Sequence, residues 1–164
     1  MDSGLQPFWA LLETNFPLGG PRRYLIDLIG SEVFGGLEAS KLLSYQRMSD
    51  TYPCPHPGGE GCPRQVIEMD DGTYHAVCGN EPRECEDLVL QRKDVEHLGV
   101  DPKTLCDAVA RALKVKPSFE GLDGIVGVFK VGTFIPDPGV RQPVFLTVRC
   151  SETDYAEVLD ALRS

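Results

Sequence analysis

The sequence predicts an α+β fold, with helices near both ends of the chain and a small antiparallel hairpin between them. Apolar residues recur at helical spacing, as in Leu105, Val109 and Leu113. In the centre, two segments rich in β-branched and aromatic residues, 64–69 and 73–77, flank an Asp-Gly turn. Two longer segments of this kind, 124–135 and 143–150, precede the last expected helix.

The bulk composition is that of an ordinary globular protein. The chain has 164 residues, of which 41% are apolar and 25% charged, and this length suits one or two small domains. No apolar run approaches the roughly 20 residues that span a bilayer, and the N-terminus lacks a basic region followed by an apolar one. We therefore expect a cytoplasmic protein that does not enter membranes.

Residues 1–49 are expected to form a helical N-terminal region. The first helix should span 7–15, the second should start at Pro21 and end at the cap residue Gly30, and the third should span 32–43. Three such helices fit a helix-turn-helix unit or a plain three-helix pack. The plain pack is favoured because the region has few basic side chains for a recognition helix: Arg22, Arg23, Lys41 and Arg47.

Residues 50–95 are expected to form a small antiparallel ribbon. The hairpin of 64–69 and 73–77 should be joined by a third short strand at 88–90. Such a ribbon has few large apolar residues, and a lone hairpin is marginally stable in water. The ribbon is therefore not expected to be stable alone.

Residues 96–164 are expected to form an α+β region with the order α-β-β-α. Asp101 should cap a helix whose first residue is Pro102. The strands at 124–135 and 143–150 should be antiparallel, and a helix over 151–162 should follow. Cys106 and Cys150 fall within apolar patterns and are expected to be small core residues.

Four cysteines of the central region carry the clearest chemical signal: Cys54, Cys62, Cys78 and Cys85. Clustered cysteines in a reducing compartment indicate a metal more often than disulfides. Cys62 precedes the first strand of the hairpin and Cys78 follows the second, so both should lie at its open end. Zinc binds four such ligands in a tetrahedron, which predicts one zinc ion at this end of the ribbon.

This central segment resembles the zinc ribbons. Cys62-Pro63, Cys78-Gly79 and the Asp71-Gly72 turn carry the resemblance, together with Cys54 and Cys85. The resemblance implies one structural zinc at the end of a small sheet, although both cysteine pairs are spaced more widely than usual. His56 is the alternative ligand for one of the cysteines, and disulfides or plain thiols are the remaining alternatives. The flanking regions resemble no family.

The expected zinc is structural, because four thiolates close the coordination shell and leave no position for water. Deaminase, zinc-protease, phosphate-loop and serine-hydrolase motifs are absent from the sequence. His75 lies in the middle of a strand and is not expected to bind the metal. A cysteine–histidine nucleophile pair stays open, but the sequence favours a protein that is not an enzyme.

The charge of the chain bears on its partners. The net charge is −9, and residues 50–95 hold four basic and ten acidic residues, a balance of −6. Such a surface repels nucleic-acid phosphates. We therefore expect a non-enzymatic regulatory or adaptor protein that acts through protein–protein contacts. The alternatives are a DNA-binding transcription regulator that uses the N-terminal helices and an enzyme with its site in the C-terminal region.

Overall fold

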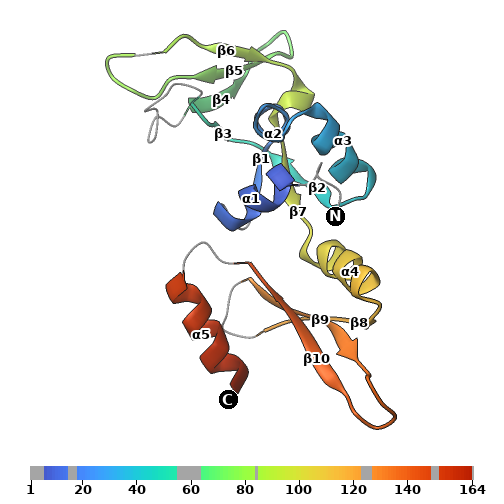
Figure 1. The fold of residues 1–164 in the computed structure, drawn as a ribbon. Helices are drawn as coiled ribbons and strands as arrows, with labels where there is room; N and C mark the ends of the chain where they lie inside the picture. Colours follow the sequence, from blue (N-terminus) through green and yellow to red (C-terminus); the bar gives the residue numbers. More distant parts are fainter. Residues whose placement is uncertain are drawn as a thin grey trace. The chain divides into compact units, whose positions relative to one another are not determined.

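The computed structural model describes residues 6–14, 18–54, 64–83, 85–122, 127–148 and 152–163. These ranges contain helices and antiparallel sheets (Figure 1), which confirms the α+β class. Among the described residues, no helix is long and apolar enough to cross a membrane.

The described strands form three sheets, with the orders β1-β7-β2, β3-β4-β5-β6 and β10-β9-β8. The helices are α1 (Gln6–Thr14), α2 (Arg22–Ile29), α3 (Ser31–Ala39), α4 (Pro102–Leu113) and α5 (Glu152–Arg163), with a short 3-10 helix, η2 (Arg92–Val95). The strands are β1 (Gly19–Pro21), β2 (Leu43–Met48), β3 (Thr51–Tyr52), β4 (Arg64–Glu68), β5 (Tyr74–Val77), β6 (Leu88–Leu90), β7 (Glu96–Val100), β8 (Lys116–Gly121), β9 (Val128–Phe134) and β10 (Gln142–Thr147).

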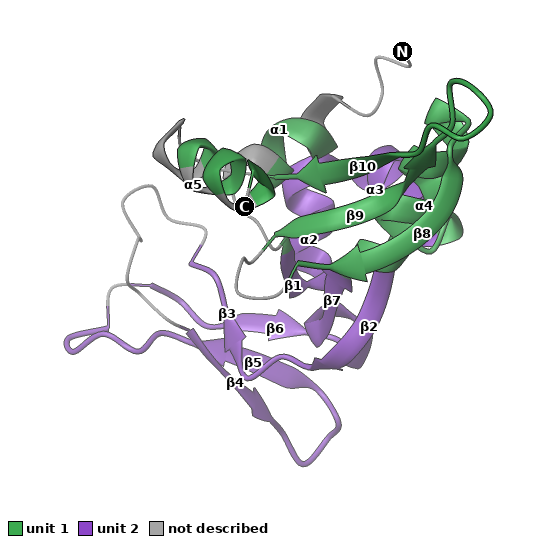
Figure 2. Cartoon of the chain, turned by 90° about the horizontal axis from the view of Figure 1, so that it is seen from below, with its two compact units in different colours: residues 1–18, 39–42, 100–164 green, residues 19–38, 43–99 purple. Residues whose placement is uncertain are grey.

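The chain divides into two compact units (Figure 2). Unit 1 comprises Met1–Leu18, Ala39–Leu42 and Val100–Ser164, and unit 2 comprises Gly19–Glu38 and Leu43–Gly99. This division differs from the three consecutive regions 1–49, 50–95 and 96–164 expected from the sequence. Most of the N-terminal region shares unit 2 with the ribbon, because its strands pair with a strand that follows the ribbon.

In unit 2 the four-stranded ribbon sheet is an insertion between two neighbouring strands of the other sheet. β2 ends at Met48 and its neighbour β7 begins at Glu96, so the chain builds the ribbon between them. The Ser49 amide donates to the Val95 carbonyl at 2.9 Å and closes the base of the insertion. Neither β2 nor β7 was predicted, since the alternation in β2 extends over only Leu43-Ser44-Tyr45-Gln46 and its start was assigned to a helix.

The ribbon gains its core from elements outside the predicted hairpin. β4 and β5 pair as expected around the turn at Gly72, whose φ is 82°, and β5 pairs with β6. One face of this sheet is buried and also receives Val95 of η2 and Tyr24 of α2. The buried cluster consists of Tyr52, Tyr74, Ala76, Leu90 and Val95. These additional side chains supply the apolar contacts that a hairpin alone lacks.

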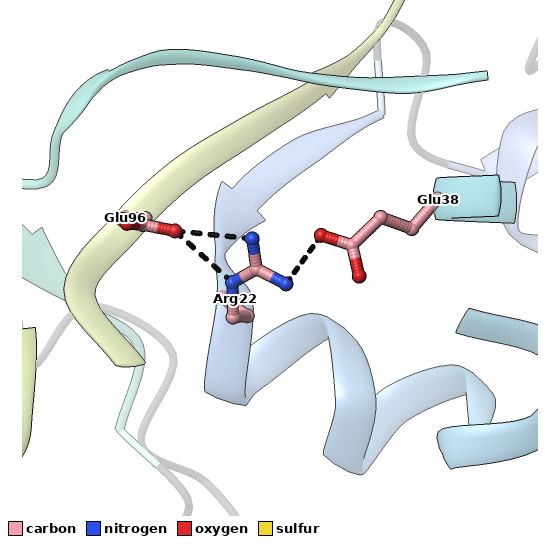
Figure 3. Close-up of polar contacts among 3 residues, drawn as sticks. All are labelled: Arg22, Glu38 and Glu96. Carbon is pink, nitrogen blue, oxygen red and sulfur yellow. Dashed lines mark hydrogen bonds and ion pairs between the residues drawn. The ribbon is translucent and has the colours of Figure 1, made fainter. Parts of the chain in front are cut away.

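Arg22 ties three elements of unit 2 together. The residue is 8% exposed, and its guanidinium donates to Glu38 of α3 at 2.6 Å and to Glu96 of β7 at 3.0 and 3.2 Å (Figure 3). It also lies 5.5 Å from the centre of the Phe34 ring. Burial lowers the pKa of Arg22, but the two carboxylates outweigh burial and raise it. The buried charge is therefore compensated from two sides.

In unit 1, α4 packs on the sheet formed by β8, β9 and β10. Cys106 and Ala110 of α4 are fully buried with Val131 of β9. The expected cap is confirmed, because the Asp101 carboxylate accepts a hydrogen bond from the Thr104 amide at 2.6 Å. The strands β9 and β10 are antiparallel, as expected.

The C-terminal order is α-β-β-β-α, so the expected α-β-β-α order lacks one strand. The additional strand β8 is exposed along its whole length, and an exposed strand carries no apolar alternation that a sequence could reveal. Two expected helix bounds also differ. Pro21 belongs to β1 and precedes α2, and α3 ends at Ala39, shortly before Lys41 adopts a φ of 60°.

Replacing Arg22 with methionine should lower the free energy of unfolding by about 2–4 kcal/mol, because Glu38 and Glu96 lose their shared cation. Urea denaturation with an unchanged m-value would measure this loss. The matched control is Arg23→Met, which breaks an exposed pair with Asp27 and should cost less than about 0.5 kcal/mol. Equal losses in the two variants would contradict a structural role for Arg22.

Asp101→Ala should remove about 1 kcal/mol of stability, because α4 loses its N-cap. Hydrogen bonds from Thr104 hold the pKa of Asp101 below its ordinary value of 3.8. The contribution of the ionised carboxylate is therefore complete above that value and is lost as the pH falls through the folded-state pKa. The stability difference between wild type and Asp101→Ala should shrink between about pH 6 and about pH 3. A difference that stays constant over this range would argue against the ionised cap.

Candidate metal centre

Three of the four predicted zinc ligands lie near one end of the ribbon sheet. Cys54 follows β3, Cys78 directly follows β5, and Cys85 lies in the connection from β5 to β6. The β-sheet register explains this convergence, since Arg64 at the start of β4 pairs with Tyr52 and the next residue pairs with Val77. Cys62 and the alternative ligand His56 fall within residues 55–63, outside the described residues.

The sulfur atoms of Cys54 and Cys85 are 3.6 Å apart. A disulfide bond would require about 2.05 Å, so these sulfurs are not covalently joined. Cys78 lies close enough to Cys85 to raise the pKa of its thiol. Four sulfurs at about 2.3 Å from a zinc ion are separated by about 3.8 Å. The Cys54–Cys85 separation is therefore close to one edge of such a tetrahedron.

The pKa of the Cys85 thiol is raised, first by its hydrogen bond with Cys54 and then by burial. A hydrogen bond with Arg64 acts in the opposite direction and lowers it. Sulfurs this close favour the protonated state, because neighbouring thiolates repel each other. A divalent cation would reverse this preference, since thiolates bind metal only after they lose their protons.

Among the described residues, Arg64 contacts the cysteine sulfurs and was not predicted as part of the site. It is 2% exposed, and hydrogen bonds join it to Cys54 and Cys85. Burial lowers the pKa of Arg64, but these hydrogen bonds outweigh burial and raise it. Its Nε and Nη1 atoms are buried and have no hydrogen-bond partner among the described residues. The available signal was strand parity, since Arg64 shares a face with the half-buried Val66.

The surroundings of Arg64 suit a metal-bound cluster of thiolates. A neutral thiol is a weak hydrogen-bond acceptor and offers a buried cation little compensation. Zinc with four thiolates carries a net charge of −2, which would place negative charge beside Arg64, a residue that forms no ion pair within the described ranges. The buried guanidinium and the sulfur ligands are therefore compatible with the zinc ion that the sequence predicts.

Within the described ranges, no group of three or more His, Cys, Asp or Glu side chains is arranged to hold a metal ion. A full ligand set requires Cys62 or His56, and both lie outside those ranges. The zinc site therefore stays a prediction.

The remaining candidate residues lie elsewhere. His75 sits in the middle of β5, between Ile67 of β4 and Val89 of β6. Cys106 is fully buried in α4, and burial raises the pKa of its thiol to about 11. Its place in the core of unit 1 confirms the expectation from the sequence. Cys150 lies outside the described residues.

Comparisons of the chain with protein-family models, curated proteins and solved structures found no match in any of the three.

Proposed function

We propose that the chain is a non-enzymatic regulatory or adaptor protein whose ribbon is held by one structural zinc ion. The ligands are Cys54, Cys62, Cys78 and Cys85, with His56 as the alternative to one of them. The observation that supports this most directly is the 3.6 Å separation of the Cys54 and Cys85 sulfurs beside the buried Arg64.

A zinc ion at this position would act on the fold and would perform no chemistry. It would join the loop after β3 to the loop after β5. Without the metal these two loops are connected only through the short pairings of β3 with β4 and of β4 with β5. The ribbon is inserted between β2 and β7. Ordering of the ribbon would therefore also stabilise the β1-β7-β2 sheet. The free energy of zinc binding would add to the free energy of folding.

The outer face of the ribbon is the surface proposed for protein contacts. Ile67, His75 and Val89 lie side by side across β4, β5 and β6, and the two apolar residues are 46% and 63% exposed. Exposed apolar residues in neighbouring strands are typical of protein contact surfaces. Acidic residues stand beyond both ends of the strands, as in Asp70 and Asp87, and favour a partner with basic groups.

The two alternative functions have less support. α2 and α3 are consecutive helices joined at Gly30, as a helix-turn-helix unit requires. However, α3 has the sequence SEVFGGLEA, which contains no basic residue, and its Glu38 is engaged by Arg22. A recognition helix without cations would be repelled by DNA. For an enzyme, Cys106 offers no nucleophile, because its thiol is fully buried with a raised pKa.

Protein purified without added metal should contain about one zinc ion per chain by elemental analysis. Cys78→Ser should lose this zinc and show a clearly lower melting temperature, because Cys78 is a proposed ligand and is buried. Cys106→Ser is the matched control, since it changes a buried cysteine in unit 1 and should retain the zinc. A metal-free wild-type protein with unchanged stability on zinc addition would refute the proposed site.

The full-length chain should not bind random duplex DNA at micromolar concentration and low salt. Its acidic surface has few cations to neutralise DNA phosphates, so binding would release few counterions and gain little free energy. Fluorescence anisotropy with a labelled duplex would measure this. Salt-sensitive binding at these concentrations would favour the DNA-binding alternative over the adaptor.

A further inference from the structure

We propose that copies of this chain associate head to tail, with one end of unit 1 in one copy bound to the outer face of the ribbon in the next copy. This association rests on the protein-contact role proposed for the ribbon, with a second copy of the chain as the partner. Both surfaces expose apolar side chains, and the two surfaces carry opposite charge.

The first surface lies at the end of unit 1 where β9 and β10 are joined, and is called here the hairpin end. The β9–β10 connection extends beyond β8 (Figure 1), because Lys116 at the start of β8 pairs with Thr133, close to the end of β9. α4 ends three residues before Lys116, and therefore at the same end of the sheet. Large apolar side chains between 43% and 55% exposed gather here: Leu113, Phe134, Ile135 and Val140.

The charged residues of the hairpin end are mainly cationic. Lys114 follows α4 with a φ of 55° and turns the chain towards β8, and Lys116 is the first residue of that strand. On the other side of β9, Arg141 directly precedes β10. These three side chains are exposed, and Asp137 is the acidic residue of the connection 135–141. The hairpin end therefore combines exposed apolar side chains with a net positive charge.

The second surface is the outer face of the ribbon. Ile67 and Val89 lie on either side of His75 across β4, β5 and β6, and Met69 follows Ile67 by two positions. Side chains two residues apart on a strand point to the same side of the sheet. Ile67, Met69 and Val89 are 46%, 42% and 63% exposed, so this face also presents apolar side chains to a partner.

Acidic side chains flank the outer face of the ribbon at both ends. Asp71 lies in the turn between β4 and β5, and hydrogen bonds from Thr73, followed by the nearby His75, lower its pKa. Asp71 is therefore ionised beside the middle strand. Asp87 is exposed and directly precedes β6, and its pair with Arg83, at 3.7 Å, is an exposed and weak one.

These properties suit the two surfaces to each other. Their contact would bury apolar side chains from both copies and would bring the cations of the hairpin end to Asp71 and Asp87. Because the two surfaces belong to different units of the chain, the contact is heterologous. A dimer would then still present one surface of each kind, to which further copies could add.

Sedimentation velocity of the full-length chain tests this association. At about 50 mM salt the mean mass should rise with protein concentration beyond that of a dimer, and about 0.5 M salt should weaken the association roughly tenfold by screening the opposite charges. Ile135→Ser with Arg141→Gln alters the hairpin end, and Val89→Thr with Asp87→Asn alters the ribbon face. Each double variant loses one apolar and one charged side chain and should associate roughly tenfold more weakly than the wild type.

A mixture of the two double variants gives the sharpest result. One variant keeps an intact ribbon face and the other an intact hairpin end, so an equal mixture should form dimers and nothing larger. The matched control is Leu159→Ser with Arg163→Gln, which removes a 52% exposed apolar side chain and an exposed arginine from α5 of unit 1. This control should associate like the wild type.

Each outcome bears on one claim. A monomeric wild-type chain, a mixture that forms no dimer, or a control that weakens association as much as the double variants would overturn the head-to-tail contact and leave the zinc proposal intact. Should Ile135→Ser with Arg141→Gln not fold, Lys116→Gln with Arg141→Gln replaces it, with the same expected result. Elemental analysis of the same sample tests the proposed zinc separately, and a zinc-free chain that still associates would count against the zinc alone.

Discussion

A buried guanidinium needs negative charge within hydrogen-bonding distance, and unit 2 contains two residues that depend on this constraint. Arg22 satisfies it with Glu38 and Glu96, one from α3 and one from β7. Those carboxylates come from elements 16 and 74 residues away in the chain, so a single charge holds a helix pair to the sheet that frames the ribbon. Removing either partner would leave a charge in a poorly solvated place.

Arg64 is buried as well, and among the described residues it contacts the sulfurs of Cys54 and Cys85. This links electrostatics to the metal, because sulfurs become full anions when a divalent cation displaces their protons. The ribbon brings the sulfur atoms of Cys54 and Cys85 within 3.6 Å of each other. A bound metal would convert these thiols into thiolates, whose negative charge would lie beside the guanidinium of Arg64.

The parts of the fold that the sequence predicted well are those with strong local signals. The Asp71-Gly72 turn and the Asp101 cap depend on neighbouring residues, and both are confirmed. The predicted apolar stripe of α4 is confirmed only in part, since Leu105 is buried but Leu113 is exposed. The strands β2, β7 and β8 were not predicted, because hydrogen bonds to their partner strands stabilise them and no local pattern reveals this pairing. The ligand set was predicted from cysteine spacing, whereas Arg64 was missed because its role depends on which side of β4 is buried.

The sequence by itself determined the α+β class, the hairpin and the position of Cys54, Cys78 and Cys85 near one end of the ribbon. Tertiary structure alone decided that the ribbon is inserted between β2 and β7, and that the chain divides into two units drawn from separate segments. The physical reason is the range of the interactions. Turns, caps and helical stripes are governed by residues a few positions apart, but strand pairing and the compensation of buried charge join residues that the chain order does not bring together.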